Sequence, residues 1–209
     1  MQHALTYRQH ARATLWLGLP LIGSHVAQFA ITLTDAAMLG WYSVDALAAE
    51  VLGGTTFFVF FIMGSGFAWA VMPMVASAQA AGQEAQVRRV TRMGAWASVL
   101  YALAVLPVLV WSGPVFRALG QGPEIAALAE DYLRIAGFAT LPALLVMVLK
   151  SYLAALERTQ VVLWVTVAAV GLNIVVNYAL IFGHWGFPEM GVQGAAIASL
   201  SVNIASFVV

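Results

Sequence analysis

The chain has 209 residues, of which 62% are hydrophobic and only 9% are charged, and its formal net charge is zero. A soluble globular domain carries about 25% charged residues, so most of this surface is expected to face lipid and not water. The balanced charge excludes the basic footprint of a nucleic-acid-binding protein, and the absence of cysteine excludes disulfides and Cys-ligated metals.

Apolar runs along the chain predict six membrane-spanning helices, because a spanning helix needs about 20 mostly apolar residues. Separated by polar or Gly/Pro breaks, they cover about residues 13–40, 46–78, 93–111, 132–156, 161–182 and 191–209. We therefore expect an all-α, polytopic membrane protein, with an N-terminal arm over residues 1–12 and a six-helix transmembrane lobe over residues 13–209. The last run is still apolar at Val209, which indicates a truncated sixth helix.

The first run carries the acidic residue with the most unusual position. Eight of the nine acidic residues, Glu50 among them, are expected in loops or at helix ends. Asp35 instead lies five residues before Gly40, roughly 7–8 Å below the end of the helix at 1.5 Å per residue. An ionised Asp at the centre of a membrane helix costs about 2.5–3.5 kcal/mol, and less nearer the interface. Asp35 should therefore face a bundle interior or a wet cavity.

Other polar residues share a helix face or a depth with Asp35. Gln28 and Thr32 precede it at spacings that place all three on one face. In the fifth run, Asn173 and Asn177 also share a face, and Asn177 lies at the same expected depth as Asp35. The alternative for these four neutral residues is that they only hold helices together by hydrogen bonds.

Two more residues belong to the candidate machinery. Tyr132, at the start of the fourth run, can reach the level of Asp35. Pro20 lies inside the first run, where proline removes a backbone hydrogen bond and permits a kink. That kink is either static or a moving hinge.

Lysine and arginine are distributed unevenly over the expected loops. Seven of the nine lie on the side of the N-terminal arm, and Lys150 and Arg158 are counted there with the fourth-to-fifth connection. Only Arg117 and Arg134 lie on the other side. The positive-inside rule therefore predicts a cytoplasmic N-terminus. The longest connection, over residues 112–131, is expected to contain a short amphipathic piece at the outer interface.

Enzymatic signatures are absent from the sequence. It has no zinc-protease helix motif, no nucleophile elbow, no phosphate loop and no dinucleotide fingerprint. Asp35 is also expected to be alone among carboxylates in the membrane, so no acidic dyad is expected there. We predict neither an enzyme nor a cofactor other than a coupling ion.

Several blocks of the sequence resemble the multidrug and toxic compound extrusion (MATE) family. They are Leu19-Pro20, Asp35, Leu47-Ala48-Ala49, Tyr152-Leu153-x-Ala155-Leu156-Glu157-Arg158-Thr159, Asn173-x-x-x-Asn177-Tyr178-x-Leu180-Ile181-Phe182-Gly183 and Gly191-Val192-x-Gly194-Ala195-Ala196-Ile197-Ala198. The resemblance covers essentially the whole chain, and the block that joins the fifth and sixth helices is its most specific part.

This resemblance implies one lobe of a twelve-helix antiporter that exports cationic amphiphilic drugs or metabolites in exchange for Na⁺ or H⁺. It implies a multi-pass protein of the plasma membrane, that of a bacterial inner membrane here, which works with a second six-helix lobe missing from this sequence. It also implies a cation or proton site, with Asp35 as the Na⁺ ligand if coupling is to sodium. The positions carried over are Asp35, Gln28, Tyr132, Asn173 and Asn177.

Two departures and two alternatives accompany the resemblance. Some relatives have a second Asp on the fifth helix, where this chain has the neutral Asn177, and the C-terminal lobe with its own acidic residues is missing. One alternative is a flippase of lipid-linked precursors with the same architecture. Another is a membrane scaffold that does not transport.

Overall fold

The computed structural model describes residues 7–209, which form helices and the loops between them. The helices are α1 (Tyr7–Tyr42), α2 (Val44–Ala80), α3 (Glu84–Val110), α4 (Gly113–Ala118), α5 (Pro123–Ala155), α6 (Thr159–Ile181), the 3₁₀ turn η1 (His184–Gly186) and α7 (Val192–Val208). Five of them, α1, α2, α3, α5 and α6, are long and apolar enough to cross a membrane, and α7 is a shorter apolar helix. The expected all-α, multi-pass fold is confirmed. Of the expected N-terminal arm, residues 1–6 lie outside the described part, and residues 7–12 are the first turns of α1.

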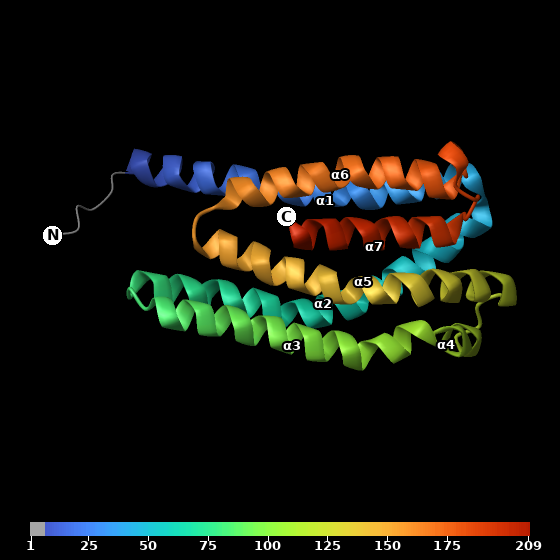
Figure 1. Ribbon diagram of the computed structural model, residues 1–209, viewed down its shortest axis with the longest axis horizontal. Coiled ribbons are helices and arrows are strands. Elements are labelled where there is room, and N and C mark those ends of the chain that lie inside the picture. Colours follow the sequence, from blue (N-terminus) through green and yellow to red (C-terminus); the bar gives the residue numbers. More distant parts are fainter. Residues whose placement is uncertain (1–6) are drawn as a thin grey trace.

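The helices form two groups that are joined through α7 (Figure 1). One group is the pair of α1 and α6, and the other contains α2, α3 and α5. Helix α7 packs against both α5 and α6. The largest apolar core lies near the α1–α2 turn. The α-helices all contribute side chains to it, α3 only from its second half, and Leu39, Leu133 and Ile181 are among its fully buried members. A second core, around Val75 and Val148, joins α2, α3 and α5 at the opposite end.

A very short turn links α1 to α2. Ser43 alone separates the two helices; its backbone N–H donates to the Leu39 carbonyl at 2.9 Å. Its hydroxyl oxygen then accepts from the Ala46 N–H at 2.9 Å and so caps the start of α2. The last turns of α1 and the first turns of α2 are therefore held side by side, which positions the candidate site.

Two helices begin nine residues before the expected start of their membrane runs. Helices α3 and α5 start at Glu84 and Pro123, because a hydrogen-bonded helix continues through polar residues that hydropathy assigns to a loop. Ion pairs one turn apart line these extensions, with Glu84 at 3.6 Å from Arg88 and Glu130 at 3.3 Å from Arg134. In the longest connection, α4 is the only separate short helix, and the apolar residues 125–129 belong to α5.

Candidate functional site

A polar cluster is buried where α1 meets α6, close to the apolar core at the α1–α2 turn. Asp35 of α1 is only 6% exposed, and Asn173 and Asn177 of α6 are fully buried. These side chains neighbour the apolar core that contains Met38 and Ile181. Burying polar groups in such surroundings is costly unless they find partners. The hydrogen bonds inside the cluster therefore determine how stable the buried charge is.

The two asparagines hold the Asp35 carboxylate from one side. Asn173 Nδ2 donates to Asp35 Oδ1 at 3.0 Å, and Asn177 Nδ2 donates to the same oxygen. Asn177 Nδ2 also donates to Asn173 Oδ1 at 3.1 Å, as the i, i+4 spacing on α6 permits. Hydrogen bonds to an ionised group are stronger than neutral ones, so this arrangement favours the carboxylate over the acid.

One polar atom of the cluster is left without a partner. Asn177 Oδ1 is buried and accepts no hydrogen bond from the described residues. Most buried polar atoms in folded proteins have a partner. An unpaired carbonyl oxygen next to a buried carboxylate is an arrangement that a cation or a protonated group can complete.

Glu50 is also part of this region, and its expected place in a loop or at a helix end is wrong. It is the seventh residue of α2 and is 8% exposed. Its carboxyl group lies close enough to Asp35 for the two charges to interact. The expectation that Asp35 is the single carboxylate of the membrane region is therefore also wrong. Burial by α5, which sequence spacing does not reveal, is the physical reason.

Tyr132 of α5 is buried and lies near both acidic residues, Asp35 and Glu50. Its ring packs against Gly53 so closely that a Cβ atom at that glycine would come within 2.8 Å of Tyr132 Cδ1. Ser199 of α7 also lies beside Tyr132 and Asp35. Helix α7 thus contributes Ser199 to the site, whereas the sequence offered Asn203 of this helix as a residue that could line the cavity.

The structure separates Gln28 and Thr32 from the buried cluster. Both side chains are exposed on α1. Gln28 Oε1 accepts a hydrogen bond from Lys150 Nζ at 3.3 Å. Lys150 was expected in a connection, but it lies within α5, five residues before its end. Since α1 and α5 do not otherwise pack against each other, this bond bridges the two helix groups.

Pro20 lies far from the cluster, fifteen residues before Asp35. Helix α1 passes through it without interruption in the structure. At 1.5 Å per residue, Pro20 and Asp35 are separated by about 22 Å along the helix axis.

The charge of the cluster is not balanced by any basic side chain that the structure describes. The ion pairs recorded there join Glu84 to Arg88 and Arg134 to Glu130 and Asp131, all away from the cluster. Two carboxyl groups in a medium of low dielectric constant cannot both remain ionised at low cost without a counter-charge. One of the two carboxyl groups must therefore be protonated or meet a positive charge from outside the described residues.

No group of three or more His, Asp or Glu side chains among the described residues is arranged to hold a metal ion. Hard cations, however, accept amide and hydroxyl oxygens beside carboxylates. Such oxygens are present here on Asn173, Asn177, Tyr132 and Ser199. The donor set suits a small monovalent cation or a proton better than a transition metal.

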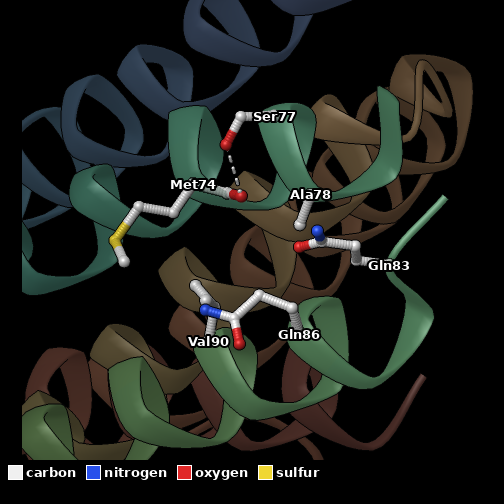
Figure 2. A pocket seen from close by; sticks show the side chains of 6 residues that line it. All are labelled: Met74, Ser77, Ala78, Gln83, Gln86 and Val90. Carbon is white, nitrogen blue, oxygen red and sulfur yellow. Dashed lines mark hydrogen bonds between the residues drawn. The ribbon is translucent and has the colours of Figure 1, made fainter. Parts of the chain in front are cut away.

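A separate cavity of about 210 Å³ lies at the opposite end of the lobe, between the tips of α2 and α3. Figure 2 shows the Gln83 amide beside Ala78, the Gln86 amide extending toward Val90, and Ser77 bonded to the Met74 carbonyl of its own helix. The lining contains no ionisable side chain. We therefore place the candidate chemistry at the Asp35 cluster and not in this cavity.

Comparison with known proteins identifies the chain's relatives. Residues 20–179, more than half of the chain, match the family described as MatE. The chain belongs to the MATE family. The matched segment contains every sequence-predicted site residue and also Glu50. MATE proteins are transporters, which agrees with the expectation that the chain is not an enzyme.

Two curated relatives of this MATE chain are similar over almost its whole length. A probable multidrug resistance protein NorM from Rhizobium meliloti (strain 1021) is 50% identical over 195 residues, which cover 93% of this chain and 42% of that protein. Its counterpart from Agrobacterium fabrum (strain C58) is 45% identical over 199 residues, which cover 95% and 43%. The chain thus spans about two-fifths of the length of the curated relatives that it matches.

Solved MATE structures share the fold. An outward-facing multidrug resistance MATE family transporter superposes with a TM-score of 0.84 at 21% identity, over 94% of this chain and 43% of that one. MATE crystal structures described as bent and as straight superpose with TM-scores of 0.84 and 0.83, each at 22% identity. These likenesses establish the architecture of one half of a MATE transporter.

Glu50 and Ser199 are the site-region residues that sequence reasoning missed, and the place of Lys150 inside α5 was missed as well. For Glu50 a signal was present, because Asp35 lies eight residues before Ser43 and Glu50 seven residues after it. Around a one-residue turn, such near-symmetric positions lie at the same depth. For Ser199 and Lys150, hydropathy and spacing offer no comparable signal.

Proposed function

We propose that the chain is the N-terminal lobe of a multidrug efflux antiporter that exports cationic amphiphilic compounds in exchange for Na⁺ or H⁺. The observation that carries this proposal is the buried Asp35 carboxylate, held by Asn173 and Asn177 with no basic partner among the described residues. Ionisable residues within membrane helices are rare and mark ion or substrate pathways.

The ion and the drug are exchanged because both compete for the negative charge of Asp35. When a proton or Na⁺ occupies Asp35, the carboxylate is neutral and the site has no attraction for a cationic drug. When the ion leaves, the exposed negative charge favours cationic cargo. Transport then requires that ion and drug have different affinities for the inward-open and outward-open states.

A second lobe would complete the transporter. The NorM relatives are more than twice as long as the segment that this chain matches. The exposed flank of α1, which carries Gln28 and Thr32, would line the central cavity between the lobes. These two residues would then contact cargo, while Asp35, Tyr132, Asn173 and Asn177 form the ion site.

Pro20 would act as the hinge of α1. Proline leaves the carbonyl one turn earlier without its helical hydrogen bond, and the Lys150–Gln28 bond joins α1 to α5, two helices that do not otherwise pack against each other. A change of bend at Pro20 would move the Gln28 flank relative to α5. MATE structures described as bent and straight make such a conformational pair a reasonable expectation for this chain.

Cationic cargo fits the lobe better than a phosphate-bearing lipid precursor. Anionic phosphates call for clusters of Arg or Lys, whereas Arg92, Arg134 and Lys150 are the basic residues that the structure places beyond the first two turns of its long helices. Arg134 is already paired with Glu130 at 3.3 Å. We also propose that the protein resides in a bacterial inner membrane with its N-terminus in the cytoplasm.

The test is efflux of ethidium from proteoliposomes that contain the complete two-lobe transporter, first under an imposed Na⁺ gradient and then under a pH gradient. One gradient should drive efflux, and Asp35→Asn should reduce the rate to that of protein-free vesicles, because Asn cannot exchange charge. The Asp45→Asn protein, altered at an exposed residue in the first turn of α2, serves as the control. Full driven efflux by the Asp35→Asn protein would disprove the site assignment.

A further inference from the structure

Glu50 has no part in the proposed function, although it is buried beside the ion site. The structure records no ion pair and no hydrogen-bond donor for its carboxyl group among the described residues. Its side chain lies along its own helix, because a Cβ atom placed on Gly54 would come within 3.1 Å of Glu50 Oε1. A buried carboxyl group with this few partners is rarely retained for packing alone.

The fold places Glu50 at the level of Asp35. From the single turn residue Ser43, Asp35 lies eight residues back along α1 and Glu50 seven residues forward along α2. At 1.5 Å per residue both lie about 11–12 Å from the turn. Tyr132 of α5 lies near both carboxyl groups, so they belong to one enclosure.

The two acids differ in what stabilises them. Asp35 Oδ1 accepts from both asparagines of α6, which stabilises a carboxylate. Glu50 receives no comparable donor. In the same cluster, the buried Asn177 Oδ1 has no partner among the described residues, and a cation or a proton donor would satisfy this acceptor.

We propose that Glu50 and Asp35 form a two-carboxyl ion site, in which Glu50 binds a second exchangeable monovalent cation, a proton or Na⁺. The proposal rests on the proposed antiport function and extends it. Glu50, without amide donors, takes up its cation first and keeps it longest, while Asp35 exchanges more readily. Arrival of a cationic cargo would then release two positive charges from this lobe instead of one.

Few other titratable groups face Glu50. Asp35 faces it from α1, and Tyr132 from α5. Helix α7 has no charged residue, and Tyr101 of α3 donates to the Phe60 carbonyl at 2.7 Å, ten residues further along α2. A proton released from this region on cargo binding therefore comes from one of the two acids.

The first experiment labels the wild-type, complete transporter with dicyclohexylcarbodiimide, an apolar reagent that adds to protonated carboxyl groups in membranes and leaves an acylurea. Peptide mapping by mass spectrometry should find the adduct on Glu50 in Na⁺-free buffer, and tetraphenylphosphonium should suppress it. If Na⁺ also suppresses the labelling of Glu50, then Glu50 binds either a proton or Na⁺. If the labelling is the same with and without Na⁺, then Glu50 binds a proton only. No adduct on Glu50, or an adduct insensitive to tetraphenylphosphonium, would overturn the proposal.

The second experiment counts protons released into weakly buffered solution when tetraphenylphosphonium is added to the purified transporter, with and without Na⁺. Glu50→Gln should lower the count by about one proton per molecule in Na⁺-free buffer, and Glu50→Asp should restore it. Asp45→Asn, on the same helix but exposed, should leave it unchanged. If Glu50→Gln does not purify as a folded protein, the wild-type labelling decides.

These outcomes distinguish failure of the two-carboxyl site from failure of the antiport function on which it rests. If the wild type binds no cargo and drives no ethidium efflux, the antiport function fails and the two-carboxyl site fails with it. If the wild type transports and Asp35→Asn abolishes transport, but Glu50→Gln releases as many protons as the wild type, the antiport function stands. In that case only the role of Glu50 is wrong.

Discussion

Asn177 shows how one neutral side chain can adjust a buried charge. Its Nδ2 group donates both to Asp35 and to Asn173, so both of its N–H bonds are used within the cluster. A hydrogen bond to a charged partner contributes about 1.5–3 kcal/mol, more than the average polar contact between membrane helices. This residue therefore affects the charge state of Asp35 and not only the packing of α6.

Replacing Asn177 by alanine should make Asp35 hold its proton more tightly, because the carboxylate loses a hydrogen bond that stabilises it. The loss of one charge-assisted hydrogen bond corresponds to a change of about 10- to 100-fold in the equilibrium between the carboxylate and the protonated acid, in favour of the acid. In practice the pH or Na⁺ dependence of ethidium efflux should shift while the maximal rate changes less. Asn203→Ala is the matched control, because Asn203 Nδ2 donates only to the Ser199 carbonyl of its own helix, at 2.8 Å. Equal shifts in both variants would contradict a special role for Asn177.

At this scale the sequence predicted part of the site. The matched depths of Asp35 and Asn177 follow from counting residues to the helix ends, and the structure joins them by a hydrogen bond. Glu50 was assigned to a helix end because a linear count cannot show that Tyr132 of α5 lies near it. Burial depends on neighbours far along the chain, and spacing within one helix carries no information about them.

At the scale of elements, α5 is the helix on which the lobe depends. It packs against α2, α3 and α7, and it brings Tyr132 to the acids and Lys150 to Gln28. Hydropathy located this helix and its neighbours but not their order in space, because an apolar run has the same hydropathy whichever helix it contacts. Hydropathy alone therefore does not give the pairing of α1 with α6, which creates the Asp35 cluster; the matched depths of Asp35 and Asn177 and the family resemblance indicate it.

The contact between α2 and α5 at Gly53 should be sensitive to one added methyl group. In Gly53→Ala the new Cβ atom would lie 2.8 Å from Tyr132 Cδ1 and 3.4 Å from the Ala129 carbonyl oxygen. Because Tyr132 is buried, its ring cannot move freely, and overpacking of this kind costs about 1–3 kcal/mol. We expect a lower melting temperature of the detergent-purified protein, by about 2–4 °C for each kcal/mol, together with weaker ion binding.

Gly66→Ala, on the same helix, provides the comparison. No heavy atom lies within 4 Å of the Cβ position at Gly66, and alanine favours a helix over glycine by up to about 1 kcal/mol. Its melting temperature should stay the same or rise slightly. If Gly53→Ala were as stable as Gly66→Ala and bound ions normally, the close packing of Tyr132 against α2 would not limit the site.

At the scale of the whole molecule, the zero net charge conceals an uneven distribution. The arginines near the start of α1 and the start of α3 lie at the same end of the helical bundle as Arg158, whereas Arg117 lies at the end with the α1–α2 turn. Placing Lys150 inside α5 removes one residue from the first group, but its majority remains. The buried acids Asp35 and Glu50 lie toward the end that has fewer basic residues.

This distribution predicts the orientation of the lobe, and the absence of cysteine makes the prediction easy to test. Single cysteines at Gln83, in the α2–α3 turn, and at Gln121, before α5, lie at exposed positions at opposite ends of the bundle. The positive-inside rule places Gln83 in the cytoplasm. A membrane-impermeant maleimide added to intact spheroplasts should therefore label Gln121→Cys but label Gln83→Cys only after permeabilisation. The reverse pattern would place Asp35 and Glu50 toward the cytoplasm, and the ion site would then have to load from the opposite side of the membrane.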